Sequence, residues 1–368
     1  MALRVVKRAK DVLVGGLSRL EYNVPPMTRI FSSQRSLAAA GLVAAVACFS
    51  PGVTGTSAQQ TPQKPAESAA LEVIQIRPQF YVIAGAGSNV AVQIGPDGAV
   101  VVDTGSADKA DQVVAEIRKL TTRPIRYVIV TSADPDHVGG NDKVSAAGQS
   151  VIPTGGLNDI GAAGGRAPIL AEENVQSRMA APTGEKSDYP FGSWPTVTYS
   201  SALEETQKDL YFNDEAIIVT YQPNAHTDGD SIVFFRRSDV LVVGDVFDQT
   251  RFPVIDLEKG GSVQGVIDSL NRIIQITVPP VPLVWQEGGT VVVPGHGLIS
   301  HEADVVDYRD MVTIVRDRIQ ALIAKGMTLE QVKKADPVKG YRRRYGSNTG
   351  AWTTDKFVEA AYRSLGGK

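Results

Sequence analysis

From Leu71 onward, short runs rich in valine and isoleucine alternate with turns built from glycine, asparagine and proline. The runs LEVIQI, FYVIAG, NVAVQIG and AVVVDTG follow one another within residues 71–105. β-Branched runs bounded by turn residues are typical of hairpin strands. A segment with helical spacing at residues 106–121 and the run RYVIVT then predict a strand–helix–strand unit. This order indicates an α/β fold.

The same succession recurs further along the chain. The strand-like runs DLYFN, AIIVTYQP, SIVFFRR and VLVVGDVF precede a segment with helical spacing at residues 262–276 and a last strand, GTVVVPGHG. One long helix is expected at about 302–325, and two shorter ones at about 328–335 and 354–365. The less regular residues 145–210 are expected to form a surface loop with one helix, ILAEENVQSRMA. Two blocks of strands followed by helices predict two similar halves packed face to face.

The first seventy residues have a different character. From Met27, a basic segment is followed by an apolar run from about Leu37 to Phe49 and by small residues ending at Ala58. This is the order of a secretory signal peptide, and the apolar run is short for a membrane span. We therefore expect export to the periplasm or the medium, with no stable membrane insertion once the leader is cleaved. An uncleaved N-terminal membrane anchor is the alternative.

These patterns predict a division of the chain into four parts. The polar, proline-rich residues after the leader read as a linker, and the last helices are expected to pack on the domain or to extend it. The parts are a leader at 1–58 with the signal peptide at 27–58, a linker at 59–70, a main domain at 71–301 and C-terminal helices at 302–368.

Cysteine content and charge exclude several classes of protein. Cys48 is the only cysteine and lies in the leader, so the mature chain would have neither a disulfide nor a thiolate ligand. Lipoprotein attachment through Cys48 is a weaker alternative, because Ala45 matches that signal poorly. A formal net charge of −3 gives no support for nucleic-acid binding. A homodimer contact through the apolar faces of the C-terminal helices stays open.

Three of the four histidines share one sequence context. His137, His226 and His296 each come just after a strand-like run, where a loop leaves the sheet. Asp245 follows VLVVG in the same way, and Asp134 and Asp136 stand beside His137 in TSADPDHVGG. Ligands and catalytic groups of α/β folds gather at strand ends, and His and Asp are the expected ligands for zinc, iron or manganese. His301 lacks this context and is expected to face solvent near a helix start.

Each of these residues also has a purely structural interpretation. Asp134 and Asp136 flank Pro135, and aspartate is common at turns and helix N-caps. His226 could be a polar loop residue, His296 could belong to a tight turn, and Asp245 could simply end a strand. The occurrence of all these contexts in one chain favours a metal site.

In order and spacing, these motifs resemble those of the metallo-β-lactamase superfamily. The family motif His-x-His-x-Asp-His corresponds to Ser132-Ala-Asp134-Pro-Asp136-His137, and the later ligands correspond to His226, Asp245 and His296. The resemblance covers roughly residues 71–300 and implies an α/β fold, namely a four-layer α/β/β/α sandwich, here with a C-terminal helical extension. It also implies a metal site at one edge, between the sheets.

The sequence departs from the family in the first motif. Ser132 and Asp134 stand where the family has two histidines, so the half of the site shared with His226 is altered. The other half, which the resemblance assigns to Asp136, His137 and His296 with Asp245 shared, is intact. Ligand count thus favours one firmly bound metal ion, with a second one weak or absent. The cofactor is expected to be one or two Zn²⁺ ions, and an oxygen-rich ligand set keeps iron or manganese as alternatives.

The resemblance implies a metal-dependent hydrolase that uses a metal-bound hydroxide on a small-molecule substrate, namely an ester, lactone, lactam or related compound. The leader predicts that this hydrolase is exported. Asp136 would be a ligand and orient the hydroxide, and Asp134 would be a ligand or serve as a general base. Tyr189, Phe191 and Trp194 lie in the expected loop over the site. Two alternatives remain open: a binding protein of the same fold that has lost catalysis, and an iron-dependent redox member of the superfamily.

Overall fold

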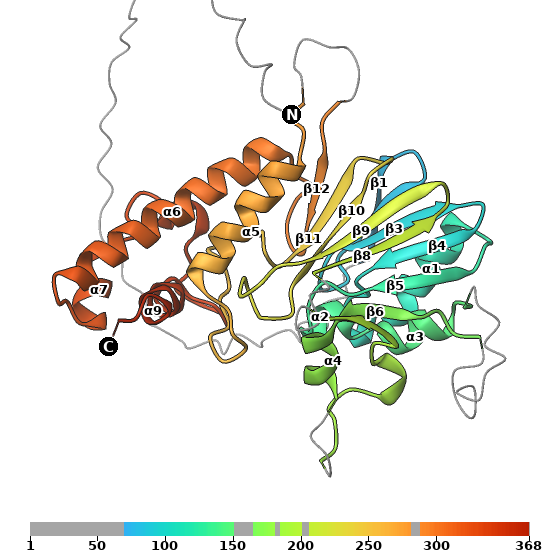
Figure 1. Cartoon of the computed structure of the whole chain (residues 1–368), viewed down its shortest axis with the longest axis horizontal. Coiled ribbons are helices and arrows are strands. Elements are labelled where there is room, and N and C mark those ends of the chain that lie inside the picture. The colour runs from blue at the N-terminus through green and yellow to red at the C-terminus, as the bar shows by residue number, and fades with distance from the viewer. Residues whose placement is uncertain (1–69, 151–164, 181–184, 201–205, 281–287, 368) are drawn as a thin grey trace, which may run out of the picture. The chain divides into compact units, whose positions relative to one another are not determined.

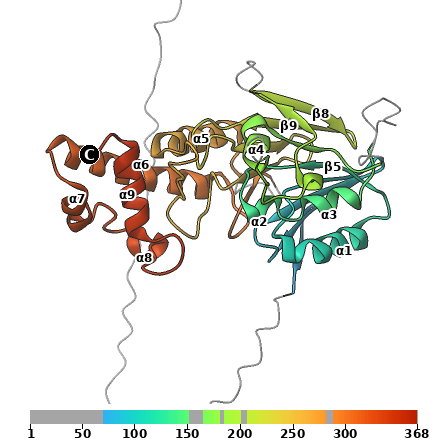
Figure 2. The same cartoon turned by 90° about the horizontal axis from the view of Figure 1, so that it is seen from below.

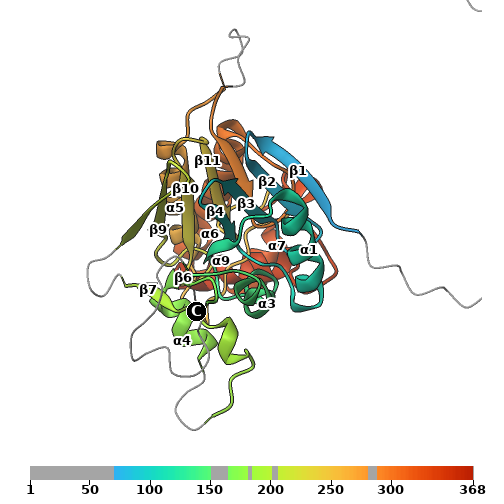
Figure 3. The same cartoon turned by 90° about the vertical axis from the view of Figure 1, so that its right-hand side faces the viewer.

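Two β-sheets lie face to face, with helices covering the outer side of each (Figure 1). The structure is a computed structural model, and it describes residues 70–150, 165–180, 185–200, 206–280 and 288–367. Figure 3 shows α5 on one outer side and α1 on the other, with the strands of both sheets between them. This is the expected four-layer α/β/β/α arrangement. The predicted leader and linker lie almost wholly outside the described residues.

The first sheet has seven strands in the order of the sequence, β1 to β7. Its first four strands are antiparallel hairpins, and β4, β5, β6 and β7 run parallel to one another. The parallel strands place their carboxyl ends at one edge, where ligands collect in α/β folds. The strands are β1 (Glu72–Arg77), β2 (Phe80–Ala84), β3 (Val90–Gly95), β4 (Gly98–Val102), β5 (Ile125–Ile129), β6 (Ile169–Glu172) and β7 (Val197–Tyr199).

The second sheet has five strands in the order β12-β11-β10-β9-β8. The neighbours from β8 to β11 are antiparallel, while β11 and β12 are parallel and end at the same edge. The strands are β8 (Gln207–Phe212), β9 (Glu215–Tyr221), β10 (Ser231–Phe235), β11 (Val240–Gly244) and β12 (Val291–Pro294).

Each sheet carries its own helices, and the C-terminal helices gather at the α5–α6 side, as seen from below in Figure 2. The helices α1 and α3, with α4, pack on the first sheet, and α5, α6 and α9 pack on the second. Their bounds are α1 (Ala110–Leu120), α2 (Pro135–Val138), α3 (Asn141–Ala146), α4 (Glu173–Met179), α5 (Val263–Ile276), α6 (Glu302–Ala324), α7 (Leu329–Ala335), α8 (Arg342–Tyr345) and α9 (Thr354–Ser364), with 3₁₀ turns η1 (Ala107–Lys109) and η3 (Phe191–Ser193).

Strand β4 shows why the sequence reads as unbroken apolar runs. Val100 and Val102 point into the core between the two sheets, while Ala99 and Val101 point to the core beneath α1 and α3. Successive side chains of a strand alternate between its faces, so a strand covered on both faces needs apolar residues at every position. Burial of both faces thus fixes the position of β4 in the middle of the sandwich.

The C-terminal helices share a core with the second sheet. Phe357 of α9 is fully buried and stacks on Phe252 with ring centroids 4.7 Å apart, and Tyr308 of α6 packs edge-on against Phe247. Phe247 and Phe252 both lie in the chain segment that follows β11. The expected C-terminal extension is therefore packed directly against the segment that leads away from Asp245. Among the described helices, none has a stretch long and apolar enough to span a membrane.

Three sequence-based expectations need correction. The predicted helix ILAEENVQSRMA divides into strand β6 and the short helix α4, because Ile169 and Leu170 face opposite cores as strand residues do. Strand β7 was not expected, since three residues are too few to show a period. His301 stands directly before α6, as expected, but it is half-buried and its Nδ1 atom is enclosed.

Candidate metal centre

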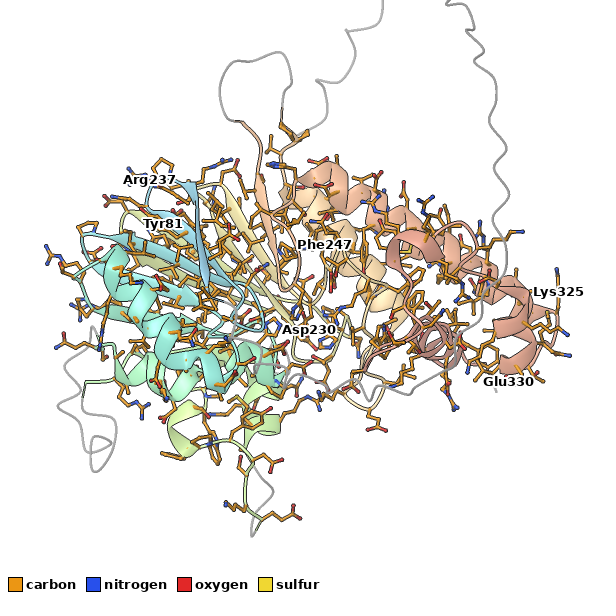
Figure 4. All side chains as sticks on the ribbon, turned by 180° about the vertical axis from the view of Figure 1, so that it is seen from behind. Tyr81, Asp230, Arg237, Phe247, Lys325 and Glu330 are labelled. Atoms are coloured by element: carbon orange, nitrogen blue, oxygen red, sulfur yellow. The ribbon has the colours of Figure 1, made fainter. Side chains whose placement is uncertain are left out.

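Six side chains from four chain segments meet at one end of the two sheets. Asp136 and His137 lie on α2 just after β5, and Asp134 directly precedes that helix. His226 lies between β9 and β10, Asp245 follows β11, and His296 follows β12. Figure 4 labels Asp230 and Arg237 at opposite ends of β10, and the six side chains lie at the Asp230 end. The structure thus brings together every residue that the sequence predicts as a ligand.

Asp136, His137 and His296 form one compact group, with one ligand atom from each lying within 4.8 Å of the others. The Nε2 atom of His296 is 3.2 Å from Oδ2 of Asp136 and 3.4 Å from Oδ1 of Asp245. Nε2 of His137 is 3.2 Å from the same Asp245 oxygen. We call these three residues, together with Asp245, the retained half. Its donor set of two imidazoles and two carboxylates suits a divalent transition metal.

His137 is oriented by a buried carboxylate behind it. Its Nδ1 atom is 2.8 Å from Oδ2 of Asp103, and both side chains are fully buried. Asp103 in turn accepts hydrogen bonds from the backbone N–H and the hydroxyl of Thr131, at 2.8 Å and 2.7 Å. Asp103 itself follows β4 in a left-handed conformation, with a φ of 60°. A ligand histidine characteristically donates its second N–H to a carboxylate, which directs the free lone pair of Nε2 towards the metal.

Two buried atoms of the retained half lack a hydrogen-bond partner. They are Nε2 of His137 and Oδ1 of Asp245, and they face each other. Since Nδ1 of His137 faces Asp103, the neutral ring presents a lone pair to a carboxylate oxygen, and such a contact needs a cation. Burial lowers the pKa of His137, but the carboxylates of Asp245 and Asp103 outweigh it and raise that pKa well above its usual value. The surroundings thus favour positive charge at this point, and a metal ion fits.

Close backbone approach makes this arrangement possible. Gly295 precedes His296, and a Cβ added there would lie 2.6 Å from Oδ1 of Asp245. The backbone carbonyl carbon of Gly244 would be only 2.9 Å away as well, so any other residue would force Asp245 or the backbone to shift. The short sequence PGHG at the end of β12 therefore allows the loops that carry Asp245 and His296 to meet.

Asp134, His226 and Asp245 form the second group, again with ligand atoms within 4.8 Å of one another. We call it the altered half. Nε2 of His226 is 3.4 Å from Oδ2 of Asp134, and its Nδ1 is 3.4 Å from Oδ1 of Asp230. The other oxygen of Asp134 accepts a hydrogen bond from Nζ of Lys259 at 2.8 Å. Burial opposes the charge on Asp134, but His226 and Lys259 outweigh it and lower its pKa well below the usual range.

The geometry separates the metal-site interpretation of Asp134 from the capping one. Asp134 does occupy the N-cap position of α2, but its side chain makes no capping hydrogen bond. Its carboxylate is engaged by Lys259 and His226 instead. Ser132 is buried, and its hydroxyl accepts a 3.4 Å hydrogen bond from the backbone N–H of Asp134. Ser132 therefore supports the turn, and Asp134 points into the site.

The aromatic residues of the expected loop lie partly at the site. The hydroxyl of Tyr189 donates to the carbonyl of Ala133 at 3.1 Å, inside the motif that carries the ligands. Trp194 donates to the carbonyl of Tyr189 and packs against the exposed Phe191. Tyr189 thus adjoins the site as expected, and Trp194 supports it. Residues 151–164 and 181–184 of that loop lie outside the described part of the chain.

Sequence reasoning missed the supporting residues. Asp103 lies near the end of the run AVVVDTG, which by itself indicates only a strand, and nothing local marks Asp230 or Lys259 as part of a site. Asp230 stands four residues after His226 in HTDGD, which resembles an ordinary turn. Lys259 is distant in sequence from Asp134, and only its spacing from Asp256 was visible, which suggests no more than a surface pair.

The sequence matches the family model of the metallo-β-lactamase superfamily over residues 83–296. This range holds all six residues of the site, and the chain belongs to that superfamily.

Among curated proteins, the chain is 24% identical over 287 residues to a linear primary-alkylsulfatase from Pseudomonas sp. (strain ATCC 19151). That alignment covers 68% of this chain and 52% of the relative, so the chain spans about half the length of the curated relative it matches.

Two solved structures share the fold. The stereoselective inverting sec-alkylsulfatase Pisa1 from Pseudomonas sp. has a TM-score of 0.56 at 16% identity, with 80% of this chain and 50% of that chain covered. A double mutant of the sec-alkylsulfatase PisA1 has a TM-score of 0.57 at 13% identity, with the same shares covered. At these identities the likeness establishes the fold alone.

Proposed function

We propose that this protein is a metal-dependent hydrolase that holds one divalent metal ion in the retained half. The observation that carries the proposal is the pair of buried, unpartnered atoms, Nε2 of His137 and Oδ1 of Asp245, facing each other at 3.2 Å. Asp136 and His296 complete a set of four ligands around them. Two imidazoles with carboxylates favour zinc, and iron and manganese remain alternatives for the same ligands.

A bound metal ion supplies Lewis acidity there, because it polarises an ester and lowers the pKa of water. The chain's own groups supply orientation and proton transfer. Asp103 fixes the ring of His137, and the side chain of Asp136, which is 38% exposed, is open to a substrate and to the attacking water. Asp136 is therefore the better candidate for accepting a proton, since both carboxylate oxygens of Asp134 already face cationic partners.

Sulfate esters are the first substrate class that we propose to test. The curated relative is named a linear primary-alkylsulfatase, and this name denotes action on sulfate esters. The relative is about twice as long as the aligned part, so its substrate is carried over only as a proposal. Carboxylic esters, lactones and lactams are tested beside the sulfate esters, because the same metal ligands suit their hydrolysis equally well.

The experiment measures metal content and hydrolysis on the same preparation. We expect about one ion per chain by elemental analysis, and turnover of at least one ester class that disappears after chelation and returns on adding the metal. Asp136→Ala and His296→Ala should each lose the ion and the activity while keeping a native circular dichroism spectrum. Absence of bound metal after reconstitution with zinc, iron and manganese would contradict the proposal.

One observation favours a second candidate, a binding protein that has lost catalysis. The altered half has lost two histidine ligands, and Lys259 already neutralises its added carboxylate. A chain that binds one metal ion but hydrolyses none of the esters, lactones or lactams, while still binding one of them, would support this candidate. Substrate binding is therefore measured alongside turnover.

We propose in addition that the protein is exported and that its leader is removed after Ala58. The support is the order of basic, apolar and small residues from Met27 to Ala58. Expression with the leader should give an exported protein whose N-terminus begins at Gln59. An intact N-terminus in the membrane fraction would favour the anchor instead.

A further inference from the structure

Among the described residues, Lys259 is the only lysine or arginine that forms an ion pair with a predicted ligand. Its Nζ atom is 2.8 Å from Oδ1 of Asp134 and 3.2 Å from Oδ2 of Asp256. The remaining oxygen of Asp134 faces His226. Asp134 replaces a family histidine, and the structure supplies a positive charge directly beside the new negative one.

The main chain of Lys259 is held in place by three hydrogen bonds. The carbonyl of Lys259 accepts hydrogen bonds from the backbone N–H of Asp228 at 2.8 Å and from Arg178 at 3.1 Å. Its N–H donates to the Asp256 side chain at 3.1 Å. A surface lysine normally samples many rotamers, but here both the main chain and the ammonium are fixed.

The turn that carries Lys259 is built against the loop that carries His226. The N–H of Asp256 donates to the carbonyl of His226 at 3.0 Å, and a Cβ at Gly261 would collide with the same carbonyl oxygen. Glycine at that position allows the two backbones to touch. Lys259 thus reaches Asp134 because of the fold of the site itself.

We propose that Lys259 serves as the resident cation of the altered half, so that its ammonium group takes the place of a second metal ion. The ammonium occupies one oxygen of Asp134, neutralises its charge and repels a divalent cation approaching His226 and Asp245. Because serine stands at position 132, that half lacks one nitrogen ligand and would bind a metal ion weakly. Such weak binding would not compensate for breaking the ion pair between Lys259 and Asp134. The proposal rests on the proposed function for one expectation only, namely that the wild type binds one metal ion in the retained half.

The test counts zinc ions per chain by equilibrium dialysis of the metal-free full chain, followed by elemental analysis. Lys259→Met removes the charge at similar side-chain length, and Lys259→Gln is a second variant that keeps a hydrogen-bond donor for Asp134. The matched control is Lys333→Met, because Lys333 also lies between two carboxylates, Glu359 at 3.1 Å and Glu330 at 3.8 Å, away from the site.

We expect about one ion per chain in the wild type and in Lys333→Met, and about two in Lys259→Met. The position of the added ion is checked by combining variants. His296→Ala alone should bind none, while Lys259→Met with His296→Ala should bind about one, held by Asp134, His226 and Asp245.

The outcomes separate the two proposals. Two ions in the wild type, or no additional ion in either folded Lys259 variant, would overturn the role of Lys259 and leave the hydrolase proposal intact. No ion in the wild type with one in Lys259→Met would support Lys259 as the resident cation and sink the retained half as the metal site. No ion in any variant would overturn both.

Discussion

At the residue scale, His137 and His226 are the two buried histidines of the site, and each turns its Nδ1 atom towards a carboxylate. The two carboxylates hold the rings with different strength. His137 is 2.8 Å from Asp103, which Thr131 holds with two hydrogen bonds. His226 is 3.4 Å from Asp230, which instead accepts shorter hydrogen bonds from the backbone N–H and the hydroxyl of Thr227. The tighter orientation belongs to the retained half, which agrees with the proposed place of the metal ion.

This difference predicts unequal effects of two matched substitutions. Asp103→Asn should weaken metal affinity about 10- to 100-fold, because the ring of His137 loses its carboxylate partner. Asparagine tolerates the left-handed backbone at this position, so the fold should be kept. Asp230→Asn should leave the affinity of the first ion within about threefold. Isothermal titration with zinc measures both, and equal losses would show that the two halves share one metal ion.

At the scale of elements, strand β6 passes directly into helix α4 at a buried carboxyl group. Glu172 ends β6 and caps α4, where its side chain accepts a 2.6 Å hydrogen bond from the backbone N–H of Asn174. It is almost fully buried. Burial raises the pKa of Glu172 from 4.5 to about 7, even though that hydrogen bond favours the ionised form. Helix α4 also contacts the turn of Lys259, because its residue Arg178 donates a hydrogen bond to the carbonyl of Lys259.

Glu172 therefore predicts a pH dependence of stability. Below pH 4.5 the carboxyl is protonated in both the folded and the unfolded chain. As pH rises from 4.5 to 7, the unfolded chain releases its proton first, so the free energy of unfolding falls by about 1–3 kcal/mol from this group. Glu172→Gln, whose amide oxygen can still cap α4, should remove this loss.

Urea unfolding of both proteins at several pH values measures the effect. The Glu172→Gln variant should match the wild type near pH 4 and exceed it by about 1–3 kcal/mol above pH 7. A constant difference between the two proteins across this range would show that Glu172 does not titrate between the two states.

At the scale of the whole described unit, the C-terminal helices are part of the core that supports the site. Phe252, which stacks on Phe357 of α9, lies between Asp245 and the turn of Lys259. Its N–H donates to the carbonyl of Tyr345 at 3.1 Å. The division predicted between residues 301 and 302 therefore marks a change of sequence pattern. We predict that the C-terminal helices and the sandwich unfold together.

Phe357→Ala tests that division. Removal of a fully buried aromatic ring should lower the free energy of unfolding by about 3–5 kcal/mol. The matched control is Phe191→Ala, a 74% exposed ring that should cost less than about 0.5 kcal/mol. Calorimetry should show one transition that shifts as a whole. Two separate transitions, with only the smaller one shifted, would show that the helices fold independently of the sandwich.

The sequence by itself indicated most of the strands, the long helices and the six residues of the candidate site. Valine-rich runs and helical spacing are local signals, and the histidines and aspartates were visible because each one follows a strand. Strand β7 and the split of β6 from α4 could not be predicted, because these elements are shorter than a recognisable period.

Only the tertiary structure decided how the site is charged. The partnership of Asp134 with Lys259 joins residues 125 positions apart, and that of His137 with Asp103 joins residues 34 positions apart. No local pattern records such pairs, because they arise when separate loops meet at one end of the two sheets. For that reason the altered motif could be read from the sequence, while the cation that compensates for it became visible only in the folded chain.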